Sequence, residues 1–471
     1  MNKIVFRCDS SSKIGRGHVT RCLALAQHLS QKSAHIEFIC RAFPGNQINR
    51  IIESNFSVHE LPWNEGQSSF TNHYEGQTDG NNWLGVPWKN DVLETIEVVK
   101  KSQPDLIVID HYGIDQNWEK TIRPYVGKIL IIDDVLDRHR SADIFLNQSD
   151  LNYVASNYKK VLADPCQVLT GPEFALLGSI YRHNSLMISL RNFSEIRRVL
   201  IYFGDSDEKI LIGKALEGLI SAKLDNLEVD LVATNPLECE RALGIYLKQF
   251  KSYQIHSNLQ SLVTLISLAD FAIGASGSTS WERLYLRLPS VLISLSENQA
   301  QIGEGLNNLG VIKWLGRRED ASIQAFTEAF LSISDAEVRK SLSMDGASIV
   351  DGRGVYRVTD ALHLDSNCEI SAKTVAFHEL SKCNKWCEPL FKSFGGIKQF
   401  SEKLVNSVLD IFCFNVMTGD LIIGMVLLER KSHNWELDFA LSPAINGKIS
   451  VSKIVSPAVK KFFAIQKGDT P

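Results

Sequence analysis

The chain has 471 residues, of which 44% are hydrophobic and 22% charged, and its formal net charge is -4. This balance excludes the polybasic surface that nucleic acids or anionic membranes attract. The length predicts two or three domains, and no uninterrupted apolar stretch is long enough to predict a membrane span.

The nine cysteines are scattered along the chain, and an odd number argues against the disulfide framework of a secreted protein. Cys383 and Cys387 form a lone pair without a second metal-binding pair nearby. The N-terminus runs directly into a predicted strand, without the regions of a signal peptide. We therefore expect reduced thiols and a cytoplasmic protein.

The first part of the chain alternates strand and helix patterns. The segment Asp91–Lys101 has helical spacing, and the polar residues 64–82 predict a surface loop. Such alternation predicts a parallel sheet with helices on both faces. The expected strands are Lys3–Arg7, Ile36–Cys40, Leu106–Asp110 and Lys128–Asp133.

A glycine-rich turn joins the first strand to a helix whose apolar face begins at Val19. Gly15 and Gly17 lie in this turn, and His18 stands at the helix mouth. The N–H groups and the helix dipole favour a phosphate there and disfavour an imidazolium, so we expect a neutral His18 that accepts a proton. Thr20 replaces the third glycine of a dinucleotide fingerprint. A tight turn with a locally packed histidine is an equally weighted alternative.

A second α/β block begins near Arg197. Two consecutive α/β halves predict two Rossmann-like domains facing each other across a cleft, with ligands beyond the carboxyl ends of the strands. The expected strands are Arg198–Phe203, Leu227–Thr234, Asp270–Gly274 and Ser290–Ser296, and the expected helices are Lys209–Leu224 and Asn258–Leu268.

A serine-rich turn around Gly277 follows the third of these strands. Gly277 permits close backbone approach, and Ser276, Ser278 and Thr279 offer hydroxyls to a diphosphate. Glu282 lies one helical turn further and is expected to accept hydrogen bonds from ribose hydroxyls. The alternative, with about equal weight, is that Thr279 and Glu282 form a capping box that serves only the helix start.

Polar residues also follow other strands. Asp110 with its neighbours, and the pair Asp133 and Asp134, fall at predicted strand ends, where each cluster is expected to face the cleft. The paired aspartates predict a metal or acid–base site. The alternative is helix capping or loop hydrogen bonding, which we favour for Asp134. No His, Asp or Glu cluster has metal-ligand spacing, so no metal is expected. Glu297, Asn298 and Gln299 stand where ligands collect, although an exposed polar tripeptide is often only a turn.

After Leu364 the composition changes. Strand patterns at Val408–Asn415, Leu421–Glu429 and Asn434–Phe439 predict an antiparallel sheet, and the turn at residues 418–420 predicts a hairpin. A helix is expected at Val451–Phe463, with Pro457 kinking or restarting it. The chain therefore divides into residues 1–190, 191–364 and 365–471, the last a small α+β extension.

A series of short motifs runs in order through roughly residues 1–364: Arg7-Cys8-Asp9, Ile14-Gly15-Arg16-Gly17-His18-Val19, Arg21-Cys22, Asp110-His111-Tyr112-Gly113, Trp118-Glu119, Ile132-Asp133-Asp134, Leu169–Leu177, Gly274–Arg283, Pro289 and Glu297-Asn298-Gln299. Together they resemble the UDP-2,4-diacetamido-2,4,6-trideoxy-β-L-altropyranose hydrolases of pseudaminic acid biosynthesis.

This resemblance implies a glycosyltransferase-B type architecture, similar to the peptidoglycan GlcNAc transferase. It also implies that water attacks C1 of a UDP-sugar and releases UDP, without a metal or another cofactor. By the same resemblance His18 is the catalytic base, Tyr112 a sugar-side contact, and Glu282 and Asn298 nucleotide-side residues. The alternatives are a glycosyltransferase, an enzyme similar to UDP-GlcNAc 2-epimerase, and an inactive UDP-sugar binding module.

Two segments depart from known patterns. Asp205 stands where this hydrolase family usually has a second glycine, and an acid beside a pyrophosphate is repulsive unless it points away or is paired. In the tail, residues 419–425 and 435–439 resemble the central strands of a Gcn5-related acetyltransferase, but residues 444–450 are a degraded version of its glycine-rich loop. We expect a partial domain that docks another protein or the main domains.

Overall fold

The computed structural model describes residues 3–63, 81–163, 165–183, 191–204, 208–363, 371–374, 390, 411–419, 421–431, 434–444 and 451–466. Contacts within the chain group it into two compact units. Unit 1 comprises residues 1–4, 88–174 and 353–471, and unit 2 comprises residues 5–87 and 175–352. The expected domain boundaries at 190 and 364 fall outside the described residues and stay predictions.

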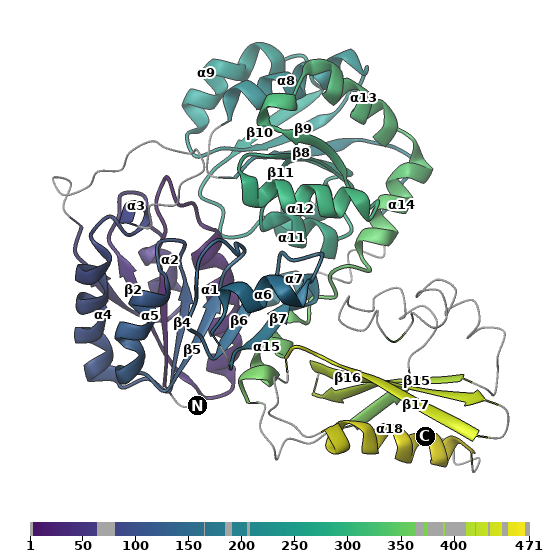
Figure 1. Ribbon diagram of the computed structural model, residues 1–471. Coiled ribbons are helices and arrows are strands. Elements are labelled where there is room, and N and C mark those ends of the chain that lie inside the picture. Colours follow the sequence, from purple (N-terminus) through teal and green to yellow (C-terminus); the bar gives the residue numbers. More distant parts are fainter. Residues whose placement is uncertain are drawn as a thin grey trace. The chain divides into compact units, whose positions relative to one another are not determined.

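The first β-sheet has seven strands in the order β3-β2-β1-β4-β5-β6-β7 (Figure 1). Pairing is parallel between β2 and β3 and from β4 through β7. Every residue of β4 is buried, as in sheets covered on both faces. The strands are β1 (Lys3–Cys8), β2 (His35–Arg41), β3 (Ser57–Leu61), β4 (Leu106–Asp110), β5 (Lys128–Ile132), β6 (Ile144–Asn147) and β7 (Gln167–Thr170).

The four strands expected in this half are confirmed. The helix expected at Asp91–Lys101 is also present, within α4. The strands β3, β6 and β7, of five, four and four residues, were not predicted from the sequence. The helices are α1 (Gly17–Gln31), α2 (Ile48–Glu53), α3 (Asn81–Leu84), α4 (Trp88–Ser102), α5 (Gln116–Ile122), α6 (Ala155–Val161) and α7 (Ser179–His183), with short 3₁₀ turns η2 (Arg123–Tyr125) and η3 (Pro172–Phe174).

The second sheet has six parallel strands in the order β10-β9-β8-β11-β12-β13. Along β8, Val199 and Ile201 join one buried core, and Leu200 and Tyr202 join a second core. This alternation gives the sheet an apolar layer on each face. The strands are β8 (Arg198–Tyr202), β9 (Glu228–Val232), β10 (Ser252–His256), β11 (Phe271–Ala275), β12 (Ser290–Ser294) and β13 (Lys313–Arg317).

The helices of this half correct two expectations. The helix expected from Asn258 begins only at Val263, because Asn258 has a φ of 52°, in the left-handed region that a right-handed helix excludes. The helix expected to reach Leu224 ends at Ser221, and Lys223 has a φ of 60°. The helices are α8 (Lys209–Ser221), α9 (Pro236–Leu247), α10 (Val263–Leu268), α11 (Thr279–Tyr285), α12 (Glu297–Asn308), α13 (Ile323–Ile333), α14 (Ala336–Gly346) and α15 (Gly354–Leu362), with the 3₁₀ turn η5 (Arg318–Asp320).

The tail forms an antiparallel sheet, β14-β15-β16-β17, with α18 (Val451–Gln466) packed on it (Figure 1). Pro457 lies inside α18, so the helix continues through it instead of restarting. The first expected strand extends beyond Asn415 to Thr418, and residues 408–410 lie outside the described part. The strands are β14 (Ser371–Thr374), β15 (Ile411–Thr418), β16 (Leu421–Lys431) and β17 (Asn434–Leu441).

Within unit 1 the tail packs on two earlier elements. The Val168 N–H of β7 donates to the Pro443 carbonyl at 3.4 Å. A Cβ built on Gly419 would stand 2.5 Å from the Asp360 carboxylate of α15. Helix α15 also packs against η3 and β16. The extension therefore rests on β7 and α15.

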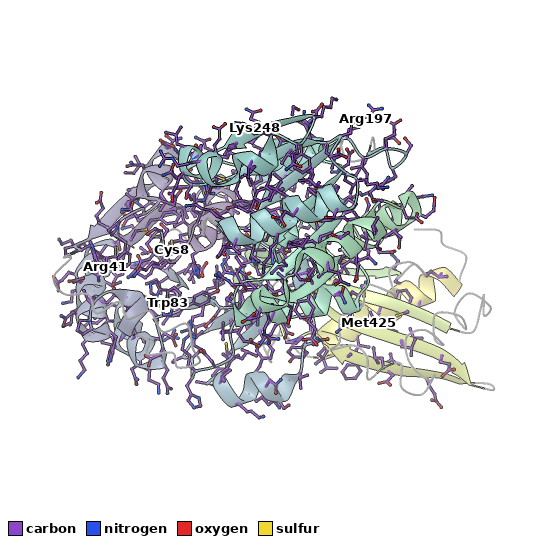
Figure 2. All side chains as sticks on the ribbon, turned by 90° about the horizontal axis from the view of Figure 1, so that it is seen from above. Cys8, Arg41, Trp83, Arg197, Lys248 and Met425 are labelled. Carbon is purple, nitrogen blue, oxygen red and sulfur yellow. The ribbon has the colours of Figure 1, made fainter. Side chains whose placement is uncertain are left out.

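The described cysteines, Cys8, Cys22, Cys40, Cys166, Cys239 and Cys413, are free thiols and buried. Cys383 and Cys387 lie outside the described residues. Cys8 in the first sheet is fully buried, whereas Arg197 and Lys248 in the second half of the chain are exposed; all three are labelled in Figure 2.

Candidate functional site

The glycine-rich turn between β1 and α1 is held by its own backbone and one serine. The Gly15 N–H donates to the Ser11 carbonyl at 2.9 Å, and Gly15 has a φ of 80°. The Ser11 hydroxyl accepts from the N–H groups of Lys13 and Ile14 at 3.1 and 2.9 Å. A left-handed residue is required at this point, which explains the glycine.

His18 is the second residue of α1 and only 6% exposed. Arg16 precedes the helix as its N-cap residue, and its side chain caps no N–H of the first turn. The first turn of a 15-residue helix therefore presents N–H groups and the positive end of the dipole next to His18. This is the location that the sequence predicted for the histidine.

A buried ion pair fixes the start of this turn. Arg7 and Asp9 pair at 2.7 Å, and both side chains are fully buried. The same Asp9 oxygen accepts the N–H of Arg41 from β2 at 2.7 Å. The motif around Cys8, to which the sequence assigned no role, therefore ties the end of β1 to the neighbouring strand.

The serine-rich turn after β11 contains two kinds of hydroxyl. Ser276 is fully buried, and its hydroxyl contacts the Ser294 hydroxyl at 2.8 Å and the Gln299 carbonyl at 2.9 Å. Ser278 is exposed and Thr279 half-buried. The Ser276 hydroxyl thus holds the turn together, and Ser278 and Thr279 are better placed to meet a ligand.

The capping-box alternative for Thr279 and Glu282 is wrong. The N-cap of α11 is Ser278, no side chain caps this helix, and Thr279 is its first residue. A capping box requires the N-cap side chain to bond to the third N–H of the helix. Glu282 therefore does not serve the helix start.

Glu282 is a buried carboxyl that can accept a further hydrogen bond. It is 9% exposed, and its Oε2 atom has no hydrogen-bond partner among the described residues. Burial raises its pKa, against the opposing effects of a hydrogen bond from Tyr181 and of the charges of Arg283, Arg50 and Arg16. An unsatisfied buried oxygen costs free energy, and a hydroxyl donor on a ligand would satisfy it.

The two turns meet within unit 2. A Cβ built on Gly17 would stand 3.4 Å from the Ser278 hydroxyl oxygen. Arg16 donates to the Tyr202 hydroxyl at 3.0 Å and to the Leu259 carbonyl at 3.3 Å. The structure therefore places the predicted catalytic turn against the predicted nucleotide turn.

Asn298 lies in the first turn of α12, directly after β12. It accepts the Ser296 hydroxyl at 2.5 Å. Its neighbours are engaged elsewhere: Gln299 accepts the Leu295 N–H at 3.0 Å, and Glu297 pairs with Arg317 at the surface. The tripeptide is thus a helix start and not a simple turn.

Tyr112 belongs to unit 1, unlike the other predicted site residues. Its hydroxyl donates to Asp134 at 3.4 Å, and the same carboxylate accepts the Ser149 hydroxyl at 2.9 Å. The Gly113 N–H donates to His111 Nδ1 at 2.9 Å, which shapes the turn that carries Tyr112. For Asp134 the loop hydrogen-bonding alternative agrees with these contacts.

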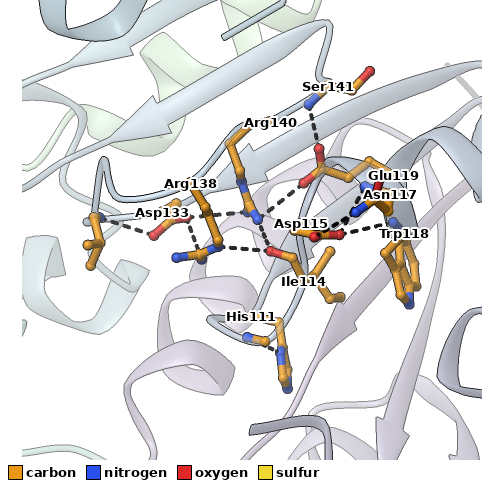
Figure 3. A network of polar contacts seen from close by, with 12 residues as sticks. His111, Ile114, Asp115, Asn117, Trp118, Glu119, Asp133, Arg138, Arg140 and Ser141 are labelled. Carbon is orange, nitrogen blue, oxygen red and sulfur yellow. Dashed lines mark hydrogen bonds and ion pairs between the residues drawn. The ribbon is translucent and has the colours of Figure 1, made fainter. Parts of the chain in front are cut away.

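Asp133 is part of a buried charge network (Figure 3). It pairs with Arg138 at 2.7 Å and with Arg140 at 3.4 Å, and Arg140 also pairs with Glu119 at 3.2 Å. Both arginines donate to the Ile114 carbonyl and so anchor the loop after β4. Burial raises the pKa of Glu119 despite Arg140. The carboxylate of Asp133 is thus paired with two guanidinium groups. This pairing does not support a metal or acid–base role for Asp133.

In the part of the chain that the structure describes, no group of three or more His, Cys, Asp and Glu side chains could hold a metal ion. In the same residues no helix is both long and apolar enough to cross a bilayer. Gly204 has a φ of 86°, and Asp205 and the two residues after it lie outside the described ranges.

No protein-family profile matches the chain. An uncharacterized protein of Methanocaldococcus jannaschii is 27% identical over 308 residues, which cover 64% of this chain and 57% of that protein. The UDP-2,4-diacetamido-2,4,6-trideoxy-beta-L-altropyranose hydrolase of Campylobacter jejuni is 26% identical over 310 residues, 65% of this chain and 97% of the hydrolase. The match to the first of these relatives thus spans little more than half of its length.

Among solved structures, MurG of Acinetobacter baumannii superposes with a TM-score of 0.54 at 11% identity, over 77% of this chain and 99% of that chain. This likeness confirms the glycosyltransferase-B type fold. The relatives confirm the resemblance to the hydrolase family that the motifs predicted.

Proposed function

We propose that this relative of the UDP-2,4-diacetamido-2,4,6-trideoxy-β-L-altropyranose hydrolases is a nucleotide-sugar enzyme that hydrolyses the same UDP-sugar to the free sugar and UDP. The observation that carries the proposal is the meeting of two turns in unit 2. A Cβ built on Gly17, beside His18, would stand 3.4 Å from the Ser278 hydroxyl oxygen, so the two turns lie side by side, and Glu282 offers a buried acceptor. The similarity to the Campylobacter hydrolase supplies the substrate.

The nucleotide side of the reaction uses the second half of the chain. Ser278 and Thr279 meet the diphosphate at the turn after β11, and Glu282 accepts hydrogen bonds from the ribose hydroxyls. Asn298, at the start of α12, completes this side. A ribose donor relieves the cost of the unpartnered Glu282 oxygen, so part of the binding free energy comes from satisfying that atom.

The chemical step uses His18 as general base. The imidazole accepts a proton from water, the water oxygen bonds to C1 of the sugar, and the bond from C1 to the diphosphate oxygen breaks. The electron pair leaves with UDP, which is a competent leaving group, so a base and correct orientation suffice. Tyr112 is a sugar-side contact in this proposal.

Incubating the purified full chain with the UDP-sugar and following UDP and free sugar tests the proposal. Release of both products without any acceptor is expected. A glycosyltransferase would show only slow background release until an acceptor is added. An epimerase would return a sugar inverted at C2. Tight UDP-sugar binding without turnover would indicate a binding module without catalytic activity. Each of these three results would contradict the proposal that the chain is a hydrolase.

A further inference from the structure

Arg16 stands directly before Gly17 and His18 in the sequence and reaches across to the second half of unit 2. One nitrogen of its guanidinium donates to the Tyr202 hydroxyl at 3.0 Å, and another donates to the Leu259 carbonyl at 3.3 Å. Because both donors belong to one planar guanidinium, the two bonds fix the orientation of this group as well as its distance from the acceptors. The side chain thus orients the turn that carries the predicted base.

The acceptor Tyr202 is itself firmly held. It is the last residue of β8, only 7% exposed, and it pairs with Gly274 of β11. A Cβ on Gly274 would stand 2.0 Å from the Tyr202 carbonyl oxygen, so a side chain at this position would displace the Tyr202 backbone. Gly274 leads within two residues to Ser276 and the serine-rich turn. Arg16 is therefore joined, through Tyr202, to the strand that positions the nucleotide turn.

A second arginine makes a parallel connection. Arg50 of α2 donates to the Thr20 hydroxyl of α1 at 2.9 Å and to the Gln260 carbonyl at 3.0 Å. The charges of Arg50 and Arg16 both act on the buried carboxyl of Glu282. The loop at Leu259 and Gln260 thus accepts from both arginines.

We propose that Arg16 is a positioning residue that sets His18 against the nucleotide turn through Tyr202 and Leu259. The inference rests on the proposed function, since it assigns His18 the task of the base. A base on one turn and a diphosphate on another must keep their separation within a fraction of an ångström for water to attack C1. Nothing in the reaction itself requires Arg16 to touch the substrate.

Tyr202→Phe is the sharpest test, because it removes only the hydroxyl that Arg16 contacts. The expected result is a fall in kcat of about 3- to 10-fold, with the Kd for UDP within about twofold of the parent protein. Arg16→Ala removes both contacts and should lower kcat by about 30-fold or more, again with UDP affinity retained. Arg16→Lys keeps a cationic donor and should recover part of this loss.

Tyr253→Phe is the matched control. Tyr253 lies in β10 of the same unit and donates its hydroxyl to Glu240 at 2.9 Å. Removing that hydroxyl should leave both kcat and UDP affinity unchanged. If Tyr202→Phe lowers the melting temperature, kcat and UDP affinity together, Arg16 has only a structural role and the proposal is overturned.

Hydrogen exchange of the full chain separates this inference from the proposed function. Amides of residues 13–20 should exchange at least about threefold faster in Tyr202→Phe and Arg16→Ala than in the parent, with α9 unchanged. Equal exchange in all three proteins would overturn the positioning role, whether or not the parent releases UDP. If the parent releases no UDP but the exchange difference is present, the hydrolase assignment is wrong. The role of Arg16 in holding the first turn through Tyr202 is then still supported.

Discussion

Gly17 and Ser278 face each other, although one begins the helix after the first strand and the other precedes a helix of the second sheet. A methyl group built on Gly17 would stand 3.4 Å from the Ser278 hydroxyl oxygen. That distance is at the edge of ordinary van der Waals contact, and Gly17 is not among the glycines with positive φ. The backbone of Gly17 thus does not require a glycine, and a methyl group there would fill the space beside the Ser278 hydroxyl.

Gly17→Ala should consequently separate stability from activity. Alanine has the higher helix propensity, so the melting temperature should stay the same or rise. The added methyl narrows the space beside the Ser278 hydroxyl, and kcat/KM for the UDP-sugar should fall by about 10-fold. Thermal denaturation and steady-state kinetics on the same preparation measure both effects.

Gly213→Ala is a matched control for that substitution. Gly213 lies within α8, and a Cβ there would meet Leu243 at 3.6 Å, an ordinary contact. This variant should gain about 0.5–1 kcal/mol of stability and keep its kcat/KM. An unchanged kcat/KM in Gly17→Ala as well would mean that substrate does not approach the first glycine-rich turn.

His18→Asn should lower kcat by about a hundredfold to ten-thousandfold, because that is the usual contribution of a general base. UDP affinity should persist, since the proposed nucleotide residues lie on the other turn. Titration calorimetry with UDP and a product assay separate the two quantities. His59→Asn changes a histidine of β3 that is 42% exposed and should leave kcat as it is. Normal turnover in His18→Asn would remove this residue from the mechanism.

The strands of both sheets follow from the sequence where they are long apolar runs, as at Leu106–Asp110. The sequence also predicts the place of His18, because a glycine pair before a helical pattern defines a strand-to-helix turn. The residues with unusual backbone angles could not be predicted from the sequence pattern. A positive φ at Asn258 delays α10 by several residues, and nothing in the local pattern indicates it.

The buried hydrogen bonds of the site could not be predicted from the sequence either. The spacing of Thr279 and Glu282 fits a capping box, and only the fold reveals that Ser278 takes the N-cap position. Ser276 looks like a free hydroxyl donor in sequence but bonds to Ser294 from the neighbouring strand. Contacts of this kind depend on tertiary structure, which spacing along one chain does not encode.

Glu282→Ala should weaken UDP binding by about 10-fold while changing kcat less, because the lost acceptor belongs to the nucleotide side. The matched variant Glu282→Gln keeps an acceptor oxygen and the shape of the side chain, and should retain more of the affinity. Calorimetry with UDP compares the three proteins. Equal affinity in the parent and Glu282→Ala would contradict the ribose assignment.

The same carboxyl predicts a pH effect on stability. Burial raises the pKa of Glu282 above its ordinary value of 4.5, so the folded state keeps a proton that the unfolded chain releases. The contribution of this group to stability is therefore full below pH 4.5 and falls as pH rises towards the raised pKa. Glu282→Gln does not titrate, and its melting temperature should decline less than that of the parent over this interval. Parallel curves for the two proteins would contradict a raised pKa.

Activity should survive exhaustive treatment with EDTA. Asp133 is occupied by Arg138 and Arg140, and Asp134 accepts hydroxyls from Tyr112 and Ser149. In the proposed step His18 activates water without a Lewis acid. Turnover after chelation and desalting should equal that of the untreated protein. Loss of turnover that Mg²⁺ or Mn²⁺ restores would require a metal-assisted route.

Removing the residues after about 366 should leave hydrolysis measurable, because the proposed site residues all precede that point. The tail instead packs on β7 and α15, through the Val168 N–H and the carboxylate of Asp360. Its loss exposes that surface, so solubility should fall, and the comparison must use kcat per folded molecule.

Gly419→Ala offers a milder version of the same test. Gly419 has a φ of 53°, and a Cβ there would stand 2.5 Å from the Asp360 carboxylate, so alanine should loosen the tail without deleting it. Both variants should keep kcat within about twofold while thermal stability falls, since strain at such a position typically costs about 1 kcal/mol or more. A soluble truncated protein that binds the UDP-sugar but does not turn it over would show that the tail contributes to the active site, because binding alone proves that the nucleotide side is still folded.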